Sequence, residues 1–251
     1  MLRHRVIPVL LVRNGGLVKT RQFKKPVYIG DPINAIRIFN EKEVDELALL
    51  DITATARSGP NLDLVRDVAS ECFMPLAYGG GVRHLDDASE LFALGVEKVI
   101  VRTAAAKGLD VVRDIASSHG RQSIAVSVDI DKGRLGGTRL HAPGTPRHAD
   151  PDWLGYVNEA VSAGAGEIVL TSVQREGTME GMDLKSIEMA SSIGVPLLAV
   201  GGVGSLDDIR AAIAAGAHAV GGGSFFVFHG PRRAVLITYP TQAELETVQG
   251  V

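Results

Sequence analysis

The chain has 251 residues, of which 45% are hydrophobic, and a formal net charge of -3. This charge argues against a general nucleic-acid-binding role, because such proteins carry a strongly basic surface. Cys72 is the only cysteine and the seven histidines show no HxxxH or similar spacing, so we expect no disulfide, no metal site and no cofactor. No apolar stretch approaches the roughly 20 residues of a membrane span, and we expect a cytoplasmic protein that binds no membrane and no nucleic acid.

The first residues resemble a secretory signal, because Arg3, His4 and Arg5 precede the apolar run 6–12. That run is at the short limit for a signal, and residues 13–16 follow it without a small-residue cleavage site. We therefore interpret the run as the first β-strand.

An internal repeat organises the whole chain. Residues 85–99 (LDDASELFALGVEKV) recur in altered form at 206–220 (LDDIRAAIAAGAHAV), an offset of 121 residues. The glycines at 79–81 precede the first copy as those at 201–202 precede the second. This period is too long for a solenoid, whose repeats span about 20–50 residues. The sequence thus predicts two similar halves, about 1–120 and 121–230, followed by a C-terminal segment.

Short apolar strands alternate with amphipathic helical stretches in each half, which predicts βαβ units and a parallel sheet. Four units in each half, without a linker between the halves, match a TIM (β/α)8 barrel of about 250 residues. We expect an α/β fold with a single domain over 1–251. The predicted strands are about 6–12, 47–52, 76–79, 98–102, 123–129, 167–172, 197–201 and 219–223.

Two aspartates lie at predicted strand ends, where barrels place their active sites. Asp51 and Asp129 each close an apolar strand, and a carboxylate is a poor core residue there. A functional role is predicted for both, with a cap of the following loop or helix as the alternative.

Glycine clusters lie at strand ends in both halves. Backbone N–H groups at a loop or helix N-terminus bind phosphate, and glycine lets the anion approach closely. Two such sites predict an elongated ligand phosphorylated at both ends, with simple tight turns as the alternative. The residues are Gly80, Gly81 and Thr103 in the first half, and Gly201, Gly202, Gly223 and Ser224 in the second.

Charged residues mark the opposite end of the barrel. Two cations and two anions lie at the starts of the predicted strands, namely Arg5, Glu46, Lys98 and Glu167. If all four point inward they form a ring, since buried charges persist only when paired. A stabilising salt-bridge cluster and a gate to a polar channel both remain open.

The chain resembles the HisF family, the cyclase subunits of imidazole glycerol phosphate synthase, over nearly all of 1–230. The similarity lies in DELALLDITA (45–54), YGGGV (78–82), GAGEIVLTS (164–172), the Gly-Thr pair at 177–178 and the two-half repeat. It implies a barrel that receives ammonia from a HisH-like glutaminase docked at its bottom. At the top it implies a lyase-type cleavage with ring closure on a ligand with two phosphates.

The resemblance also implies roles for individual residues. They are an ammonia gate (Arg5, Glu46, Lys98, Glu167), a mobile loop that closes over substrate (Lys19, Phe23), one phosphate site (Gly81, Thr103, with Arg102 beside it), a second phosphate site (Gly177, Gly202, Ser224) and one of two catalytic aspartates (Asp129).

The second catalytic aspartate is missing, because Leu11 occupies its place. A leucine cannot exchange protons, and general acid–base steps contribute about 10²–10⁴-fold. Asp51 and Glu176 are candidate substitutes. Arg102 replaces the usual asparagine beside the first phosphate, where a guanidinium could add to binding or block it. Further departures are Gln174 and Glu176 in place of aspartates, and Val200 in place of serine.

A subgroup of HisF-like proteins shares three further motifs, at 10–20, 72–81 and 226–240. Resemblance to it implies ammonia delivery for acetamidino-sugar formation in surface-polysaccharide synthesis, with a sugar amidotransferase as a candidate further partner. Two other interpretations remain open. One is an authentic cyclase of histidine biosynthesis, and the other is a non-catalytic scaffold that binds a phosphorylated effector and activates the glutaminase. The C-terminal segment could cover the barrel or contact another subunit.

Overall fold

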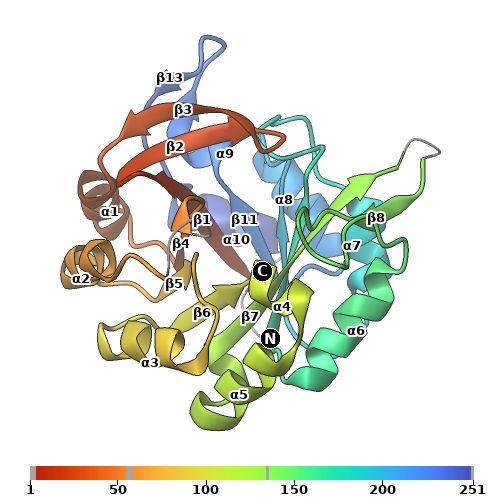
Figure 1. The fold of residues 1–251 in the computed structure, drawn as a ribbon. Helices are drawn as coiled ribbons and strands as arrows, with labels where there is room; N and C mark the ends of the chain where they lie inside the picture. The colour runs from red at the N-terminus through yellow and green to blue at the C-terminus, as the bar shows by residue number, and fades with distance from the viewer. Residues whose placement is uncertain (1–3, 55–58, 134–135, 250–251) are drawn as a thin grey trace.

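The computed structural model describes residues 4–54, 59–133 and 136–249. Parallel strands close into a barrel surrounded by helices (Figure 1), so the predicted TIM (β/α)8 architecture is confirmed. The closing contact pairs the first and last barrel strands in parallel, with Arg5 opposite Ala219. In order, the barrel strands are β1 (Arg5–Arg13), β4 (Leu47–Asp51), β5 (Leu76–Gly79), β6 (Lys98–Val101), β7 (Ile124–Lys132), β9 (Glu167–Ser172), β10 (Leu197–Val200) and β11 (Ala219–Gly222).

The helices lie outside the barrel, and several begin at a capping side chain. Asp31 accepts a hydrogen bond from the Asn34 amide, and Ser205 accepts one from the Asp208 amide. In chain order the helices are α1 (Pro32–Glu41), α2 (Leu62–Glu71), α3 (Leu85–Ala93), α4 (Thr103–Lys107), α5 (Asp110–His119), a 3-10 turn (Arg121–Ser123), α6 (Trp153–Ala163), α7 (Leu184–Ala190), α8 (Leu206–Ala214), α9 (Ser224–Val227) and α10 (Gln242–Gln249).

The helices and strands begin and end at positions that follow the repeat found in the sequence. Strands β5 and β6, helix α3 and the start of α4 are displaced by 121 residues from β10, β11, α8 and the start of α9. Equivalent positions in the two halves can therefore be compared residue by residue.

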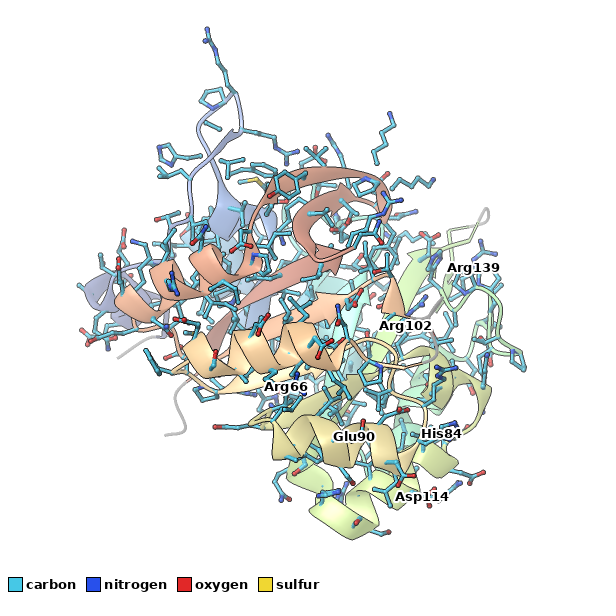
Figure 2. All side chains as sticks on the ribbon, turned by 60° about the vertical axis from the view of Figure 1, so that its left-hand side comes forward. Arg66, His84, Glu90, Arg102, Asp114 and Arg139 are labelled. Carbon is cyan, nitrogen blue, oxygen red and sulfur yellow. The ribbon has the colours of Figure 1, made fainter. Side chains whose placement is uncertain are left out.

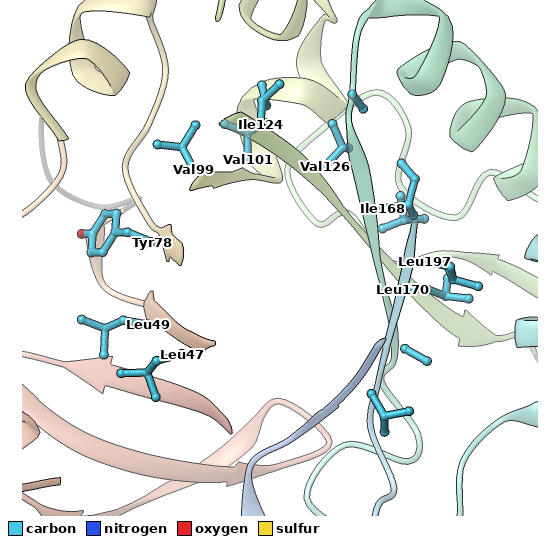
Figure 3. Close-up of a cluster of buried hydrophobic side chains, with 14 of the residues drawn as sticks. Leu47, Leu49, Tyr78, Val99, Val101, Ile124, Val126, Ile168, Leu170 and Leu197 are labelled. Carbon is cyan, nitrogen blue, oxygen red and sulfur yellow. The ribbon is translucent and has the colours of Figure 1, made fainter. Parts of the chain in front are cut away.

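Side chains along each strand point alternately outward and inward, so the core has two layers. Side chains that point outward pack beneath the helices, among them Leu49, Tyr78 and Ile124 (Figure 3). Side chains that point inward form a separate cluster inside the barrel, and alanine is frequent there: Ile7, Val9, Ala48, Ala77, Ile100, Ala125, Val169, Leu198 and Ala219. The barrel interior is thus filled chiefly by small and aliphatic groups.

Two of the three short-strand additions, the β2–β3 hairpin and β8, extend the barrel sheet, whereas the third forms a separate two-stranded sheet. A hairpin of β2 (Gly16–Arg21) and β3 (Lys24–Gly30) follows β1 after a turn in which Asn14 and Gly15 both have positive φ. Strand β8 (Thr138–Leu140) pairs with β7, and β12 (Phe228–His229) pairs with β13 (Ala234–Val235). The segment expected to form a mobile loop after strand 1 is a hairpin with two register shifts between β2 and β3, and its mobility stays a prediction.

The C-terminal segment packs on the barrel of its own chain. The Tyr239 hydroxyl donates to the carbonyl of Val6 at 2.7 Å, and its ring lies 5.5 Å from that of Phe226. Within the described ranges, every helix is too short or too polar to cross a membrane.

Gly166, at the turn into β9, provides a test of the packing. A Cβ at this position would lie 2.0 Å from the carbonyl oxygen of Arg121, whereas a Cβ on Gly108 would meet nothing within 4 Å. We expect Gly166→Ala to lower the free energy of unfolding by about 1–3 kcal/mol, because backbone must move to admit the methyl group. Urea denaturation should show Gly108→Ala close to the native chain, and equal midpoints for the two variants would contradict this account.

Candidate functional site

Four charged side chains form a closed ring at the N-terminal end of the barrel strands. Arg5 pairs with Glu46 through Nη1 and with Glu167 through Nη2. Lys98 Nζ lies 3.1 Å from Glu46 Oε1 and 2.5 Å from Glu167 Oε2. Each cation therefore contacts both carboxylates, and the structure brings together all four residues singled out in the sequence.

Because the ring is buried, the stability of the barrel depends on all four of its charges. Glu46 and Glu167 are both buried. Burial disfavours the charge on Arg5, but the carboxylates of Glu167 and Glu46 outweigh that effect and raise the pKa of Arg5 above its usual value. Removing one partner would leave a buried charge uncompensated, which is strongly destabilising. Mutual pairing therefore holds the ring together.

At the other end of the barrel lies a cavity of about 680 Å³, into which residues from both halves project. Its walls include every glycine, hydroxyl and carboxylate residue predicted for the C-terminal ends of the strands, a region hereafter called the mouth. From the first half come Asp51, Gly80, Gly81, Arg102 and Thr103, and from the second half come Asp129, Glu176, Gly177, Gly201, Gly202, Gly223 and Ser224. Lys19 and Phe23 reach the same cavity from the hairpin.

In the second half, a buried hydroxyl faces the cavity without a protein partner. Ser224 Oγ has no hydrogen bond within the described part of the chain. Beside it, Lys19 Nζ lies 2.2 Å from the position that a Cβ on Gly223 would occupy, so the lysine lies close against the backbone there. An orphaned hydroxyl next to an ammonium group is suited to bind an anion.

Lys19 is buried, and its Nζ donates to the carbonyl of Val9 at 2.6 Å. Burial lowers the pKa of Lys19 to about 8, and the carboxylate of Glu176 offsets part of that effect. The amine is therefore largely protonated at neutral pH, and an anion bound nearby would favour its charged form further.

The first half presents Gly80 and Gly81 with positive φ, at 133° and 77°. A Cβ on Gly81 would lie 2.5 Å from the carbonyl oxygen of Gly59. Close packing and positive φ are therefore enough to explain why glycine occurs at these two positions, as the tight-turn alternative expects. Their position in the cavity wall leaves the anion-binding prediction open.

Asp129 is held by an arginine. Arg102 Nε lies 2.5 Å from Asp129 Oδ2, and Arg102 Nη2 donates to the carbonyl of His141 at 2.9 Å. The Nε–H does not point along the line to the oxygen, so the contact is an ion pair rather than a linear hydrogen bond. The second oxygen, Oδ1, accepts from Ser127 Oγ at 3.2 Å. The carboxylate predicted to be catalytic is therefore paired on both sides.

The candidate substitutes for the missing aspartate are also engaged. Leu11 lines the cavity. Asp51 Oδ1 accepts hydrogen bonds from the amide and hydroxyl of Thr53, at 2.9 and 2.6 Å. This geometry matches the loop-capping alternative for Asp51. A catalytic role for Asp51 or Glu176 stays a prediction.

Glu176 fastens the β2–β3 hairpin, hereafter the lid, across the cavity. Its Oε1 accepts from Thr20 Oγ1 at 2.9 Å and its Oε2 from the amide of Phe23 at 3.0 Å. Its backbone carbonyl accepts from the amide of Gln22 at 2.9 Å. A Cβ on Gly177 would lie 2.2 Å from the carbonyl oxygen of Thr20, so the close approach needs glycine.

Sequence reasoning missed two contacts of this site. It placed Arg102 beside a phosphate but did not pair it with Asp129, and it treated Glu176 as an acid rather than as the anchor of the lid. Both pairs join residues that are far apart in the chain, so no local pattern reveals them. Over residues 4–54, 59–133 and 136–249, no three His, Cys, Asp or Glu side chains gather as a metal site would need.

Comparison with known proteins assigns the chain to a family. The family model described as "Histidine biosynthesis protein" matches residues 5–230. A Pseudomonas aeruginosa protein named "Putative imidazole glycerol phosphate synthase subunit hisF2" is 48% identical over 98% of this chain and 99% of its own length. A Helicobacter hepaticus protein named "Imidazole glycerol phosphate synthase subunit HisF" is 36% identical over 95% of both chains.

A Leptospira borgpetersenii protein named "Putative imidazole glycerol phosphate synthase subunit HisF" is 44% identical over 99% of both chains. The family model and these relatives span almost the entire barrel, including the ring at one end and the cavity at the other. The chain therefore belongs to the HisF family of histidine biosynthesis proteins.

Proposed function

We propose that this chain is a HisF-like subunit that takes ammonia from a HisH-like glutaminase and relays it through the barrel to an amidotransfer reaction. The reaction proposed is acetamidino-sugar formation for surface polysaccharide, with a sugar amidotransferase as a further partner. The observation that carries the proposal is the contrast between the two ends of the barrel. The four-charge ring is complete, whereas at the mouth Leu11 stands where the family resemblance implies a carboxylate, and Asp129 is paired with Arg102.

The mouth chemistry argues against ordinary cyclase activity. Acid–base catalysis needs a group that can accept and return a proton near the operating pH. Asp129 is paired with Arg102, Asp51 is bound by Thr53, and Glu176 holds the lid. Leu11 cannot exchange protons, and each of the three carboxylates that line the described mouth already has such a contact. A scaffold that only activates the glutaminase would share this geometry, and detecting a converted ligand would exclude it.

The interior supports a relay role. Alanines project into the barrel from four strands, at positions 48, 77, 125 and 219. Small side chains leave more room along the axis than the branched residues common in such barrels. Ammonia is small and uncharged, unlike ammonium, so such a path suits it better than it suits an ion.

The end of the barrel that carries the ring also exposes an aromatic side chain. Phe73 precedes β5 and is 84% exposed, the largest value among the exposed large hydrophobic residues. Its amide donates to Asn40 Oδ1 at 3.1 Å, which fixes the backbone there. Large exposed aromatic residues on rigid backbone are typical anchors of protein interfaces. We place the glutaminase on this face.

The test of the proposal is complex formation with the chain's HisH-like glutaminase. We expect a stable complex with faster glutamine hydrolysis, and Phe73→Asp should weaken it at least tenfold, about 1.4 kcal/mol or more, by burying a charge in the interface. Val235→Asp is the matched control, because Val235 is a 51%-exposed apolar residue of the β12–β13 hairpin. Isothermal titration calorimetry and a glutaminase assay give both values. Failure of the native chain to bind the glutaminase would overturn the proposal.

A second expectation concerns the lid, which we propose closes over a phosphorylated ligand. Glu176→Gln removes one charge-assisted acceptor of the Phe23 amide, which costs about 1.5–3 kcal/mol. The lid should then open more often, and limited trypsin digestion should cut after Arg21 and Lys24 about tenfold faster or more. Glu188→Gln is the control, since Glu188 is an exposed residue of α7 that does not line the cavity. Similar cleavage of both variants would show that Glu176 does not hold the lid.

A further inference from the structure

The two halves of the barrel diverge after a pair of equivalent short helices. In the first half α4 leads into the longer helix α5, whereas in the second half α9 leads directly into the β12–β13 hairpin. This hairpin therefore continues the helix that begins at Ser224, whose hydroxyl has no partner in the described part of the chain. Both Figure 1 and Figure 2 show the hairpin beside the lid.

Arg233, in the turn of this hairpin, reaches the loop that follows β9. Its Nη2 donates to the carbonyl of Gly177 at 2.8 Å and to the carbonyl of Thr178 at 3.3 Å. Its guanidinium carbon also lies over the ring of Phe228, 5.6 Å from the centroid, which is a favourable contact for a cation. Arg233 does not line the cavity, so its guanidinium acts on the loop and not on a ligand.

The loop that Arg233 contacts, residues 175–179 and hereafter the anchor loop, has a backbone that needs support. Gly177 has a φ of 70° and Met179 a φ of 61°. A residue with a Cβ is uncommon at such a φ, and it persists there only where the surrounding structure fixes it. The two carbonyls that Arg233 binds lie between these two positions, and both Gly177 and Met179 line the cavity.

The anchor loop also holds the lid. Glu176, directly before Gly177, accepts hydrogen bonds from the Thr20 hydroxyl and the Phe23 amide. A continuous series of contacts therefore runs from α9 through the hairpin and Arg233 to the anchor loop, and from there to the lid. Loss of the Arg233 contact would free the middle of this series.

We propose that Arg233 is a positioning residue that fixes the anchor loop against α9, and thereby sets both the closure of the lid and the placement of Gly177 relative to Ser224. These two residues belong to the second phosphate site, so the inference rests on the lid and the phosphate site proposed above. It gives the C-terminal segment a role in the cavity of its own chain.

The first test measures opening of the lid by limited chymotrypsin digestion of the full chain. Arg233→Gln should speed cleavage after Phe23 and Tyr28 about tenfold, because two hydrogen bonds to a charged donor are lost. Cleavage after the exposed Phe73, at the opposite end of the barrel, is the internal reference and should not change. Arg232→Gln is the matched control, since Arg232 is an exposed residue of the same turn with the same charge.

The second test measures binding of inorganic phosphate by calorimetry at constant ionic strength. Arg233→Gln should weaken phosphate binding about three- to tenfold, and Arg232→Gln should leave it nearly unchanged. Arg233→Lys keeps the charge but lacks the planar fork that reaches two carbonyls, so it should restore only part of the affinity. Because salt screens exposed charges, the loss in Arg233→Gln should persist at higher ionic strength if it arises from positioning.

The outcomes separate this inference from the proposals on which it rests. Equal lid cleavage in Arg233→Gln and Arg232→Gln would overturn it, and so would faster cleavage at Phe73 together with a lowered urea midpoint, which would mark a general loss of stability. An unchanged phosphate affinity beside faster lid cleavage would overturn the role in the anion site. If the native chain binds no phosphate, the phosphate site itself is wrong, and the digestion alone decides whether Arg233 positions the lid.

Discussion

Parallel pairing of β1 with β11 closes the sheet, and both ends of the molecule depend on that closure. It places Arg5 on β1 within reach of Glu46 and Glu167, which are 41 and 162 residues further along the chain. At the opposite end it brings Lys19 and Leu11 to the same cavity as Gly223 and Ser224. Because the interior between them is filled by small and aliphatic side chains, the two ends share one axis while their chemistry can change independently.

That independence explains how a complete ring at one end of the barrel occurs together with altered residues at the mouth. The ring at one end must stay complete, since a missing partner would strand a buried charge. At the mouth, Arg102 can pair with Asp129 without harm to the fold, because the cavity and not the core surrounds it. The lid constrains two further positions. The Glu176 carboxylate holds the lid through contacts that a shorter acid would not reach, and Gly177 lets it approach more closely than a residue with a Cβ would.

The sequence predicted the barrel because its signals are local and repeated. Apolar strands, helix starts and the 121-residue offset can each be read without knowledge of contacts, and the four ring residues followed from charges at strand starts. The Arg102–Asp129 pair and the role of Glu176 could not be predicted, because each depends on side chains from different strands meeting across the mouth. The hairpin after β1 had a usable signal in Asn14-Gly15, which favours a two-residue turn.

The most direct test of the account is synthesis of imidazole glycerol phosphate from the two-phosphate synthase substrate and ammonium salt at alkaline pH, without a glutaminase. The native chain should turn over at least about 10²-fold more slowly than the Helicobacter hepaticus relative, because one general acid–base group is missing. Leu11→Asp, combined with Arg102→Asn to release Asp129, should restore part of that rate. Native turnover at the rate of the relative would contradict the claim that the mouth has lost cyclase chemistry.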